Sequence, residues 1–417
     1  MEHFAALVGI DWSDKKHDVC LVDLATGKRE QLIINHTPEA LDAWVTKLRA
    51  RFPGQKLAVG LEQSRGPLIF ALFKYDFLVL YPINPTTLAK YREAFSPSRA
   101  KDDPQDAEYL VELLIHHRDR LKPWLPDDEK TRTLQYLVEH RRRLVNDRTR
   151  ISNRMTALLK AYFPQVLEWF DDIRTLMVCD FLTSWPTLEA VKKARPTTLE
   201  KFFREHNSVR KETIEKRIVA IKEAVPLTTD KAAINSSVLM VKALASQMKT
   251  TSDAIAEFDR EIETLCQTHA DYFIFDSLPG SGTVYSSRLL AALGTDRNRW
   301  TSVDDLLCFS GVAPVIERSG KQERIRWRYF CPKFLRQSFI EYAGESIKHS
   351  FWAKAYYSSQ RARGKSHQAA VRALAFKWIR IIYRCWQTQT AYSEVTYLES
   401  LRKKGSPLLT FAANNPS

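Results

Sequence analysis

Residues 4–11 read FAALVGID, a short apolar run that ends in an acidic residue. An uncharged run of this length predicts a buried β-strand. Asp11 closes the run, so the first candidate for site chemistry lies at the end of the first predicted strand.

The chain around this strand alternates between strand and helix patterns as far as residue 125. Strands are predicted at 18–24, 31–34, 57–61 and 77–81, and helices at 38–51, 66–74, 85–95 and 104–117. Three adjoining strands followed by β-α units predict an α/β fold, a mixed five-stranded sheet with flanking helices. Glu62 follows the fourth strand directly.

The rest of the chain has mainly helical patterns. Leu137, Leu144, Ile151 and Leu158 recur every seven residues, which predicts a coiled-coil seam on one long helix at 127–165. A second amphipathic helix near 252–269 could pair with it. We expect four regions: an α/β domain at 1–125, a helical and coiled-coil region with an insertion at 126–272, a mainly α domain at 273–395 and a disordered tail at 396–417.

Lysine and arginine outnumber aspartate and glutamate by 63 to 49, which gives a formal net charge of +14. A surplus of this size favours a polyanionic partner, although a basic solvated surface is the plain alternative. The six cysteines form no C-x-x-C pair, so no zinc site or redox pair is predicted. Lys74 and Asp76 interrupt the apolar stretch at 67–83, which argues against a membrane span. With no signal-peptide pattern, we expect a cytoplasmic protein.

Four acids are candidate catalytic metal ligands: Asp11, Glu62, Asp103 and Asp106. Asp103 and Asp106 are three residues apart at the start of a predicted helix and therefore share one helix face. Converging carboxylates repel one another unless cations neutralise them, and Mg²⁺ prefers such oxygen ligands. Two Mg²⁺ ions could activate the attacking oxygen and stabilise the leaving oxygen in phosphodiester cleavage.

Each acid also has a plain structural alternative. Asp11 could cap a turn, and Glu62 could form a salt bridge at the sheet edge. Asp103 could cap its helix, with Asp106 in the first turn. Spacing alone leaves open whether Asp102 or Asp103 is the ligand.

Three segments resemble the DEDD motif of transposases of the insertion-sequence one-ten family, relatives of the Piv/MooV DNA invertases. These segments are VGIDWS at 8–13, GLE at 60–62 and KDDPQDA at 101–107. The family's third motif reads Lys-x-Asp-x-x-Asp-Ala, so the resemblance maps its acids onto Asp103 and Asp106. Three later segments are similar to the family's second conserved domain: LPGSG at 278–282, FSGVAP at 309–314 and RSGK at 318–321.

The resemblance implies an RNase H/RuvC-like catalytic domain at 1–125 and a C-terminal transposase domain at 273–395. Ser319 is then the candidate nucleophile, which forms a covalent 5′-phosphoserine with DNA; alternatively, Ser319 and Gly320 only form a turn in a basic loop. A serine hydroxyl needs a base or a metal to activate it. The resemblance further implies donor and target double-stranded DNA, a structured non-coding guide RNA, a homodimer or tetramer, and association with the nucleoid.

Binding to a nucleic-acid backbone requires arginine and lysine, while base pairing with a guide can supply specificity. The candidate contacts are Arg141, Arg142, Arg143, Arg148, Arg154, Arg318, Lys321, Arg324, Arg326, Arg328 and Lys333. Trp327, Tyr329 and Phe330 lie among the last of these and could stack on bases. The segment 325–333 departs from the glycine-rich stretch of relatives. A solvated charged face is the alternative for any single basic run.

Three rival functions remain open at this point. A hydrolytic RuvC-like junction nuclease would use the same acids without Ser319. An actin-like sugar kinase could use residues 8–11 with Asp18 and Gly27 as a phosphate loop, but the later glycine-rich loops of that fold are missing. A non-catalytic nucleic-acid-binding protein would need none of the acids.

Overall fold

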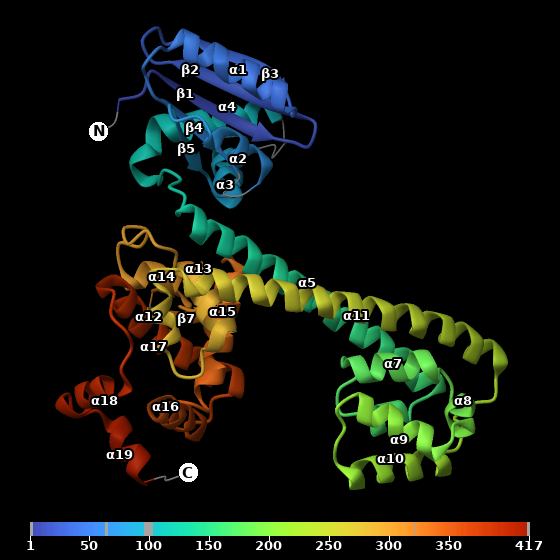
Figure 1. The fold of residues 1–417 in the computed structure, drawn as a ribbon. Coiled ribbons are helices and arrows are strands. Elements are labelled where there is room, and N and C mark those ends of the chain that lie inside the picture. Colours follow the sequence, from blue (N-terminus) through green and yellow to red (C-terminus); the bar gives the residue numbers. More distant parts are fainter. Residues whose placement is uncertain (1–2, 63–65, 96–102, 321, 415–417) are drawn as a thin grey trace. The chain divides into compact units, whose positions relative to one another are not determined.

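The computed structural model describes residues 3–62, 66–95, 103–320 and 322–414 (Figure 1). The chain divides into two compact units, residues 1–126 and 127–417. The first unit contains a mixed five-stranded sheet with flanking helices, and the second is almost entirely helical. The predicted fold class is therefore confirmed.

The sheet of the first unit has the strand order β3-β2-β1-β4-β5. Its strands are β1 (Ala6–Trp12), β2 (Lys16–Asp23), β3 (Arg29–Asn35), β4 (Leu57–Leu61) and β5 (Leu78–Pro82). β2 is antiparallel to both β1 and β3, whereas β4 is parallel to both β1 and β5. Ile10 pairs with Leu61 in the parallel ladder, so the residues that follow them reach the same edge of the sheet.

Helices cover both faces of this sheet. They are α1 (Pro38–Arg51), α2 (Pro67–Phe73), α3 (Pro85–Phe95), α4 (Asp103–His117) and the 3₁₀ turn η1 (Arg118–Arg120). On one face, Val8 and Ile10 pack in a core with Trp44 of α1. On the other face, Leu7 packs in a core with Val111 of α4. Alternate residues of β1 therefore bury opposite sides of the sheet.

Helix α4 lies directly on the sheet because glycine occupies the positions beneath it. A Cβ atom at Gly9 would lie less than 3.0 Å from the backbone oxygen of Ala107, and a Cβ atom at Gly60 would lie 3.3 Å from that of Leu110. Neither glycine has a positive φ. These positions therefore need glycine for the space it leaves and not for an unusual backbone conformation.

Two long helices organise the second unit, α5 (Glu129–Tyr162) and α11 (Lys231–Gln267). They run side by side and antiparallel, since Lys130 bonds to Thr268 and Arg154 lies near Met240 (Figure 1). One end of the pair belongs to a hydrophobic core formed with the C-terminal helices, and the other end belongs to a second core. The helix pair thus connects two cores within one unit.

The predicted heptad seam on α5 is only partly right. Ile151 is buried, but Leu137, Leu144 and Leu158 are half-buried. The other buried residues of the helix are Thr131, Leu134, Val138, Met155, Leu159 and Tyr162. The buried positions form two runs with steps of three or four residues, at 131–138 and 151–162. Besides α11, α5 also packs against α6 and α13. Contact with several neighbours buries a wider face than a two-stranded seam does.

The remaining helices fall into two groups. Around the core that contains Ile151 lie α6 (Val166–Trp169), α7 (Leu176–Ser184), α8 (Leu188–Lys193), α9 (Pro196–Glu205) and α10 (Lys211–Glu223). The other group comprises α12 (Tyr272–Asp276), α13 (Gly282–Leu293), α14 (Val303–Phe309), α15 (Lys333–Ser346), α16 (Phe351–Ala362), α17 (His367–Thr388), α18 (Glu394–Lys403) and α19 (Pro407–Asn414). Among the described residues, no helix combines the length and the apolarity that crossing a membrane requires.

The segment at 396–417, which we expected to be disordered, contains regular structure. Helices α18 and α19 lie within residues 394–414. Leu398, Leu401 and Leu408 pack against the core of the second group. No residue of α18 is fully buried, because only one side of the helix packs against the core. The apolar periodicity of this segment is therefore weak.

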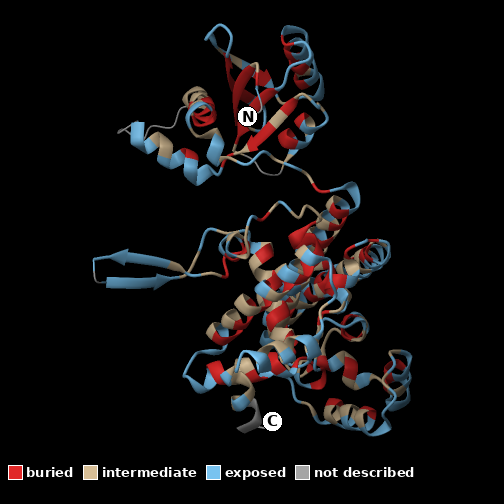
Figure 2. Ribbon diagram, turned by 90° about the vertical axis from the view of Figure 1, so that its left-hand side faces the viewer, coloured by how far each residue is buried: buried red, intermediate tan, exposed pale blue. Residues whose placement is uncertain are grey.

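Within the described part of the second unit, one element is not helical. β6 (Val315–Ser319) and β7 (Gln322–Arg326) form a two-stranded antiparallel ribbon, which we call the hairpin. All of its residues but Val315 are exposed among those described, and Figure 2 shows it projecting from the unit. The sequence patterns predicted no strands in this segment.

We expect Gly9→Ala to lift α4 from the sheet, because the added methyl group has no room against a backbone atom. Overpacking of this kind costs roughly 1–3 kcal/mol. Hydrogen exchange followed by mass spectrometry should show faster exchange across α4. Gly60→Ala should have a smaller effect, and Gly344→Ala, where the nearest atom is 3.8 Å away, should have none. Unchanged protection of α4 in the Gly9 variant would contradict the proposed packing.

Candidate active site

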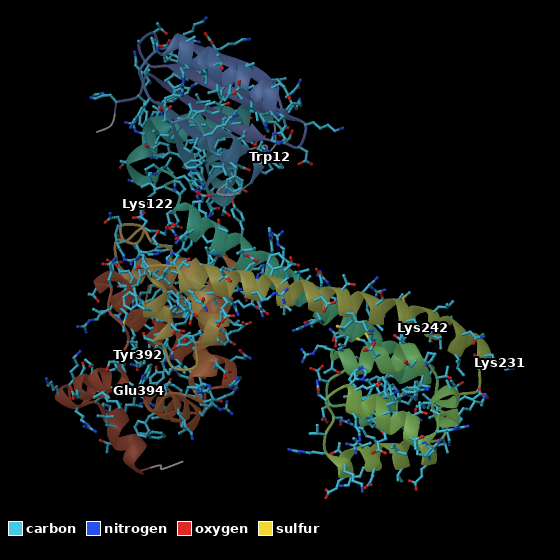
Figure 3. The ribbon with its side chains drawn as sticks, in the orientation of Figure 1. Trp12, Lys122, Lys231, Lys242, Tyr392 and Glu394 are labelled. Carbon is cyan, nitrogen blue, oxygen red and sulfur yellow. The ribbon has the colours of Figure 1, made fainter. Side chains whose placement is uncertain are left out.

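Three of the acids predicted as metal ligands come together at one end of the sheet. Ligand oxygens of Asp11, Asp103 and Asp106 all lie within 4.8 Å of one another. Asp11 precedes Trp12, the last residue of β1 (labelled in Figure 3), and the other two acids lie in the first turn of α4. Asp11 is 7% exposed and Asp106 is 1% exposed. Their charges are therefore nearly removed from water and need compensation.

Glu62, the fourth predicted ligand, lies at the end of the neighbouring strand. It follows Leu61, which pairs with Ile10, so its backbone is about 4.8 Å from that of Asp11. Its side chain is half-buried and is not a member of the three-acid group. The structure therefore brings three predicted ligands together and places the fourth beside them. Asp102, the alternative to Asp103, lies outside the described residues.

The three-acid group fits a hard divalent cation. It offers carboxylate oxygens, which are the ligands that Mg²⁺ and similar ions prefer. Asp103 and Asp106 also lie in the first turn of α4, where the helix dipole favours negative charge. An ion held by these two residues and Asp11 would offset the repulsion that remains between the carboxylates.

Two charged residues at this site were not among those predicted. Arg92 of α3 donates from Nε to Oδ1 of Asp106 over 2.7 Å, and its Nη2 donates to the other carboxylate oxygen. Asp18 of β2 lies directly across from Asp11 and is also buried. A signal for Arg92 existed in the sequence, since it lies four residues after the buried Leu88 and so on the same face of α3.

A pair of histidines, one of them buried, lies on the other face of the same strand ends. His17, opposite Trp12 in the β1–β2 ladder, is fully buried, and its Nε2 lies 2.9 Å from Nδ1 of His36. Burial, together with the smaller effect of the nearby His36, lowers the pKa of His17 from 6.5 to about 4. Its Nδ1 has no hydrogen-bond partner among the described residues. The neutral imidazole is therefore the form that the fold accepts.

Ser319 lies in the second unit, at the end of β6. Gly320 follows it in the left-handed region, with φ of 57°, and the chain then returns along β7. The serine is exposed and directly opposite Gln322. The structure thus places the predicted nucleophile at the turn of a projecting hairpin.

The predicted arginine contacts on α5 are partly engaged within the chain. Arg141 pairs with Asp259, and Arg142 pairs with Glu139 at 2.7 Å. Arg143 and Arg154 are exposed, and Arg148 is half-buried. Arg143 also forms an ion pair with Glu139, over 3.5 Å. A cation already matched by a carboxylate adds less attraction for phosphate, so the exposed Arg154 is the stronger candidate on this helix.

The predicted contacts near the hairpin also divide into two kinds. Arg318, Arg324, Arg326 and Lys333 are exposed, while Lys321 lies outside the described residues. Arg328 is half-buried, and its Nε donates to the backbone oxygen of Ala313 over 3.4 Å. Arg328 therefore anchors the base of the hairpin.

The aromatic residues after the hairpin differ in how accessible their rings are. The guanidinium of Arg372 lies over the ring of Trp327, with its carbon 3.3 Å from the ring centroid, and Arg336 lies 5.0 Å from it. Trp327 is thus half-buried and already stacked with a guanidinium of the protein, which makes it a weaker candidate for stacking on a base. Tyr329 and Phe330 are 75% and 83% exposed, so their rings remain accessible for stacking.

Two models of known protein families match this chain, one in its N-terminal part and one in its C-terminal part. A family model described as a transposase, of the DEDD type of IS110, matches residues 8–164. A second model, described as the transposase IS116/IS110/IS902 family, matches residues 273–358. The first match includes all four predicted acids, and the second includes Ser319 and the whole hairpin.

Individual relatives agree with these matches. The chain is 27% identical to the "Mini-circle putative transposase for IS117" of Streptomyces coelicolor, over 97% of this chain and 98% of the relative. It is 26% identical to an uncharacterized 42 kDa protein of the insertion element IS900 of Mycobacterium paratuberculosis, over 71% of this chain and 74% of the relative. It is also 26% identical to an uncharacterized 44.8 kDa protein of the insertion element IS116 of Streptomyces clavuligerus, over 68% and 70%.

We expect Arg92→Gln to strengthen divalent-ion binding, because it removes a positive charge that engages both oxygens of Asp106. The gain should be roughly tenfold in affinity, equivalent to about 1.4 kcal/mol. Isothermal titration with Mn²⁺ measures it. Arg49→Gln, which breaks the exposed ion pair with Asp76 in the same unit, is the matched control and should leave affinity unchanged. Equal or weaker binding by the Arg92 variant would refute this competition.

We expect the buried His17 to make the fold sensitive to mild acid. Its folded pKa of about 4 lies below its ordinary value of 6.5, so between these two values the unfolded chain takes up a proton that the folded chain does not. Stability is therefore lost as pH falls from 6.5 towards 4, by on the order of 3 kcal/mol. Urea unfolding across this range should show a shallower pH dependence for His17→Gln. Identical pH profiles would rule out His17 as the cause.

Proposed function

This chain belongs to the IS110 family of DEDD transposases, and from that premise we propose that it cuts and rejoins DNA as the recombinase of an insertion sequence. The observation that carries the proposal is the group formed by Asp11, Asp103 and Asp106, whose oxygens lie within 4.8 Å of one another. Such a group suits the handling of a phosphodiester, because divalent cations held by carboxylates bind phosphate oxygens.

Asp11, Glu62, Asp103 and Asp106 are proposed to hold two Mg²⁺ ions. When bound, these ions supply positive charge to the attacking and leaving oxygens of the phosphate. The residues themselves position the ions: the strand ends hold Asp11 and Glu62, and the first turn of α4 holds the other two acids. Arg92 balances part of the negative charge and orients both oxygens of Asp106.

Ser319 is proposed to be the nucleophile. Its Oγ forms a bond to phosphorus, the bond from phosphorus to the 3′ oxygen breaks, and the electron pair leaves with that oxygen. The serine hydroxyl releases its proton to water, and the 3′ oxygen takes one up from water. The product is a 5′-phosphoserine and a free 3′-hydroxyl, and the reverse attack by a different 3′-hydroxyl rejoins the strands. The exposed position of Ser319 supports this role, since DNA is too large to enter a closed pocket.

The proposed partners follow from the same function. Donor and target double-stranded DNA are the substrates, and a structured non-coding RNA from the element is the proposed guide. The net charge of +14 and the exposed rings of Tyr329 and Phe330 support binding of nucleic acid. A homodimer or tetramer, located in the cytoplasm with the nucleoid, completes the proposal.

The decisive experiment is a search for a covalent protein–DNA adduct. The full chain is incubated with Mg²⁺, with DNA spanning its gene and flanking sequence, and with RNA transcribed from those flanks, and is then resolved on a denaturing gel. We expect an adduct that Ser319→Ala abolishes, because no other group replaces the hydroxyl. Asp103→Asn should abolish it through loss of a metal ligand, whereas Ser236→Ala, at an exposed serine on α11, should not.

Two results would contradict the proposal in different ways. Strand cleavage without any adduct would favour the hydrolytic junction nuclease. An adduct that persists in Ser319→Ala would place the nucleophile elsewhere.

A further inference from the structure

The hairpin presents two chemically different faces. Ser319 pairs with Gln322, Arg318 with Glu323, and Glu317 with Arg324. Because side chains alternate along a strand, every second pair lies on the same face. Ser319 and Gln322 therefore share a face with the Glu317–Arg324 pair. The opposite face carries Arg318 and Glu323, together with the exposed side chains of Ile316 and Ile325.

The arginines of the hairpin are not equally available to a ligand. Arg318, on the face away from the serine, is bound to Glu323 over 2.9 Å. Arg326, on the serine's face, is bound to Glu317 over 3.1 Å. Arg324 is the one hairpin arginine with no carboxylate within ion-pair distance among the residues that the structure describes, although Glu317 lies across from it. The only carboxylate on that face is thus already engaged by Arg326.

We propose that Arg324 binds the scissile phosphate of DNA beside Ser319. This inference rests on the proposed function of Ser319 and adds a second residue to the same site. Arg324 is the diagonal cross-strand neighbour of Ser319, and such neighbours are about 7–8 Å apart. A phosphate fits between the serine hydroxyl and a long arginine side chain that extends along that face.

The chemistry of the step explains why an arginine is suited to this place. As Oγ of Ser319 attacks, negative charge accumulates on the two non-bridging oxygens of the phosphate. The planar guanidinium of Arg324 can donate to both oxygens at once, which an ammonium group cannot do with the same geometry. Gln322, directly opposite the serine, adds an amide that can donate to the same group. The Glu317–Arg326 pair is neutral overall, so it does not repel the phosphate.

The test compares Arg324→Gln with Arg318→Gln, which removes the same charge from the other face of the hairpin. Two quantities are measured on the full chain: the rate of adduct formation with the DNA and RNA described above, and the salt dependence of binding to a short duplex of arbitrary sequence. We expect Arg324→Gln to slow adduct formation by roughly 100-fold or more and to reduce the salt slope by about 1. Arg324→Lys should restore the slope but only part of the rate.

Arg318→Gln should reduce both quantities less than Arg324→Gln does, because Arg318 lies on the face away from Ser319 and is already bound to Glu323. Equal effects of the two variants on the rate would overturn the assignment of Arg324. If the wild-type chain forms no adduct, the salt slopes decide, and equal slopes overturn the assignment. Persistence of the adduct in Ser319→Ala would instead refute the proposed function, so the two failures are distinguishable.

Discussion

The close packing of α4 on the backbone of β1 is the constraint on which the acid cluster depends. Gly9 leaves no atom between the sheet and the backbone oxygen of Ala107. Three mutually repelling carboxylates would not assemble by their own charges, since their proximity costs free energy. The apolar contacts of α4 with the sheet, through residues such as Val111 and Leu114, hold the helix in place against that repulsion.

Charge balance at the cluster involves more than the acids. Arg92 reaches from α3 and engages Asp106, whose side chain is almost fully buried. A buried carboxylate without a counter-charge would be strongly destabilising. The same guanidinium competes with any divalent ion for the oxygens of Asp106. The affinity of the site for metal therefore depends on how much more strongly the carboxylate binds the ion than it binds the guanidinium. Asp18, across the ladder from Asp11, adds a further negative charge that favours the metal.

The formal charge of +14 overstates the positive charge available to DNA or RNA. Arg141 and Arg142 on α5 are matched by acids, as are Arg318 and Arg326 of the hairpin. Ion pairs of this kind contribute little to stability when exposed, but they reduce local positive potential. On the hairpin, Arg324 therefore supplies a larger share of the positive charge available to a ligand than the number of arginines in the segment suggests.

Local sequence patterns were sufficient to predict the strands and the helix that carry the four acids. The apolar run before Asp11, the strand before Glu62 and the helix start at Asp103 each have a periodicity that depends only on neighbouring residues. The order of these elements was also sufficient to predict a mixed five-stranded sheet. The helix expected at 252–269 was found, but it begins at Lys231, because its first turns pack against a core formed by distant residues.

Only the tertiary structure decided which side chains meet. Arg92 meets Asp106 through the packing of two different helices, although the two residues are only 14 positions apart. The stacking of Arg372 on Trp327 and the helical segment after residue 394 depend on contacts between more distant segments. The pairing register of the hairpin likewise decides that Arg324, and not Arg318, shares a face with Ser319. A sequence specifies local conformation through nearby residues, whereas the partner of a charged or aromatic side chain is selected by the packing of the whole fold.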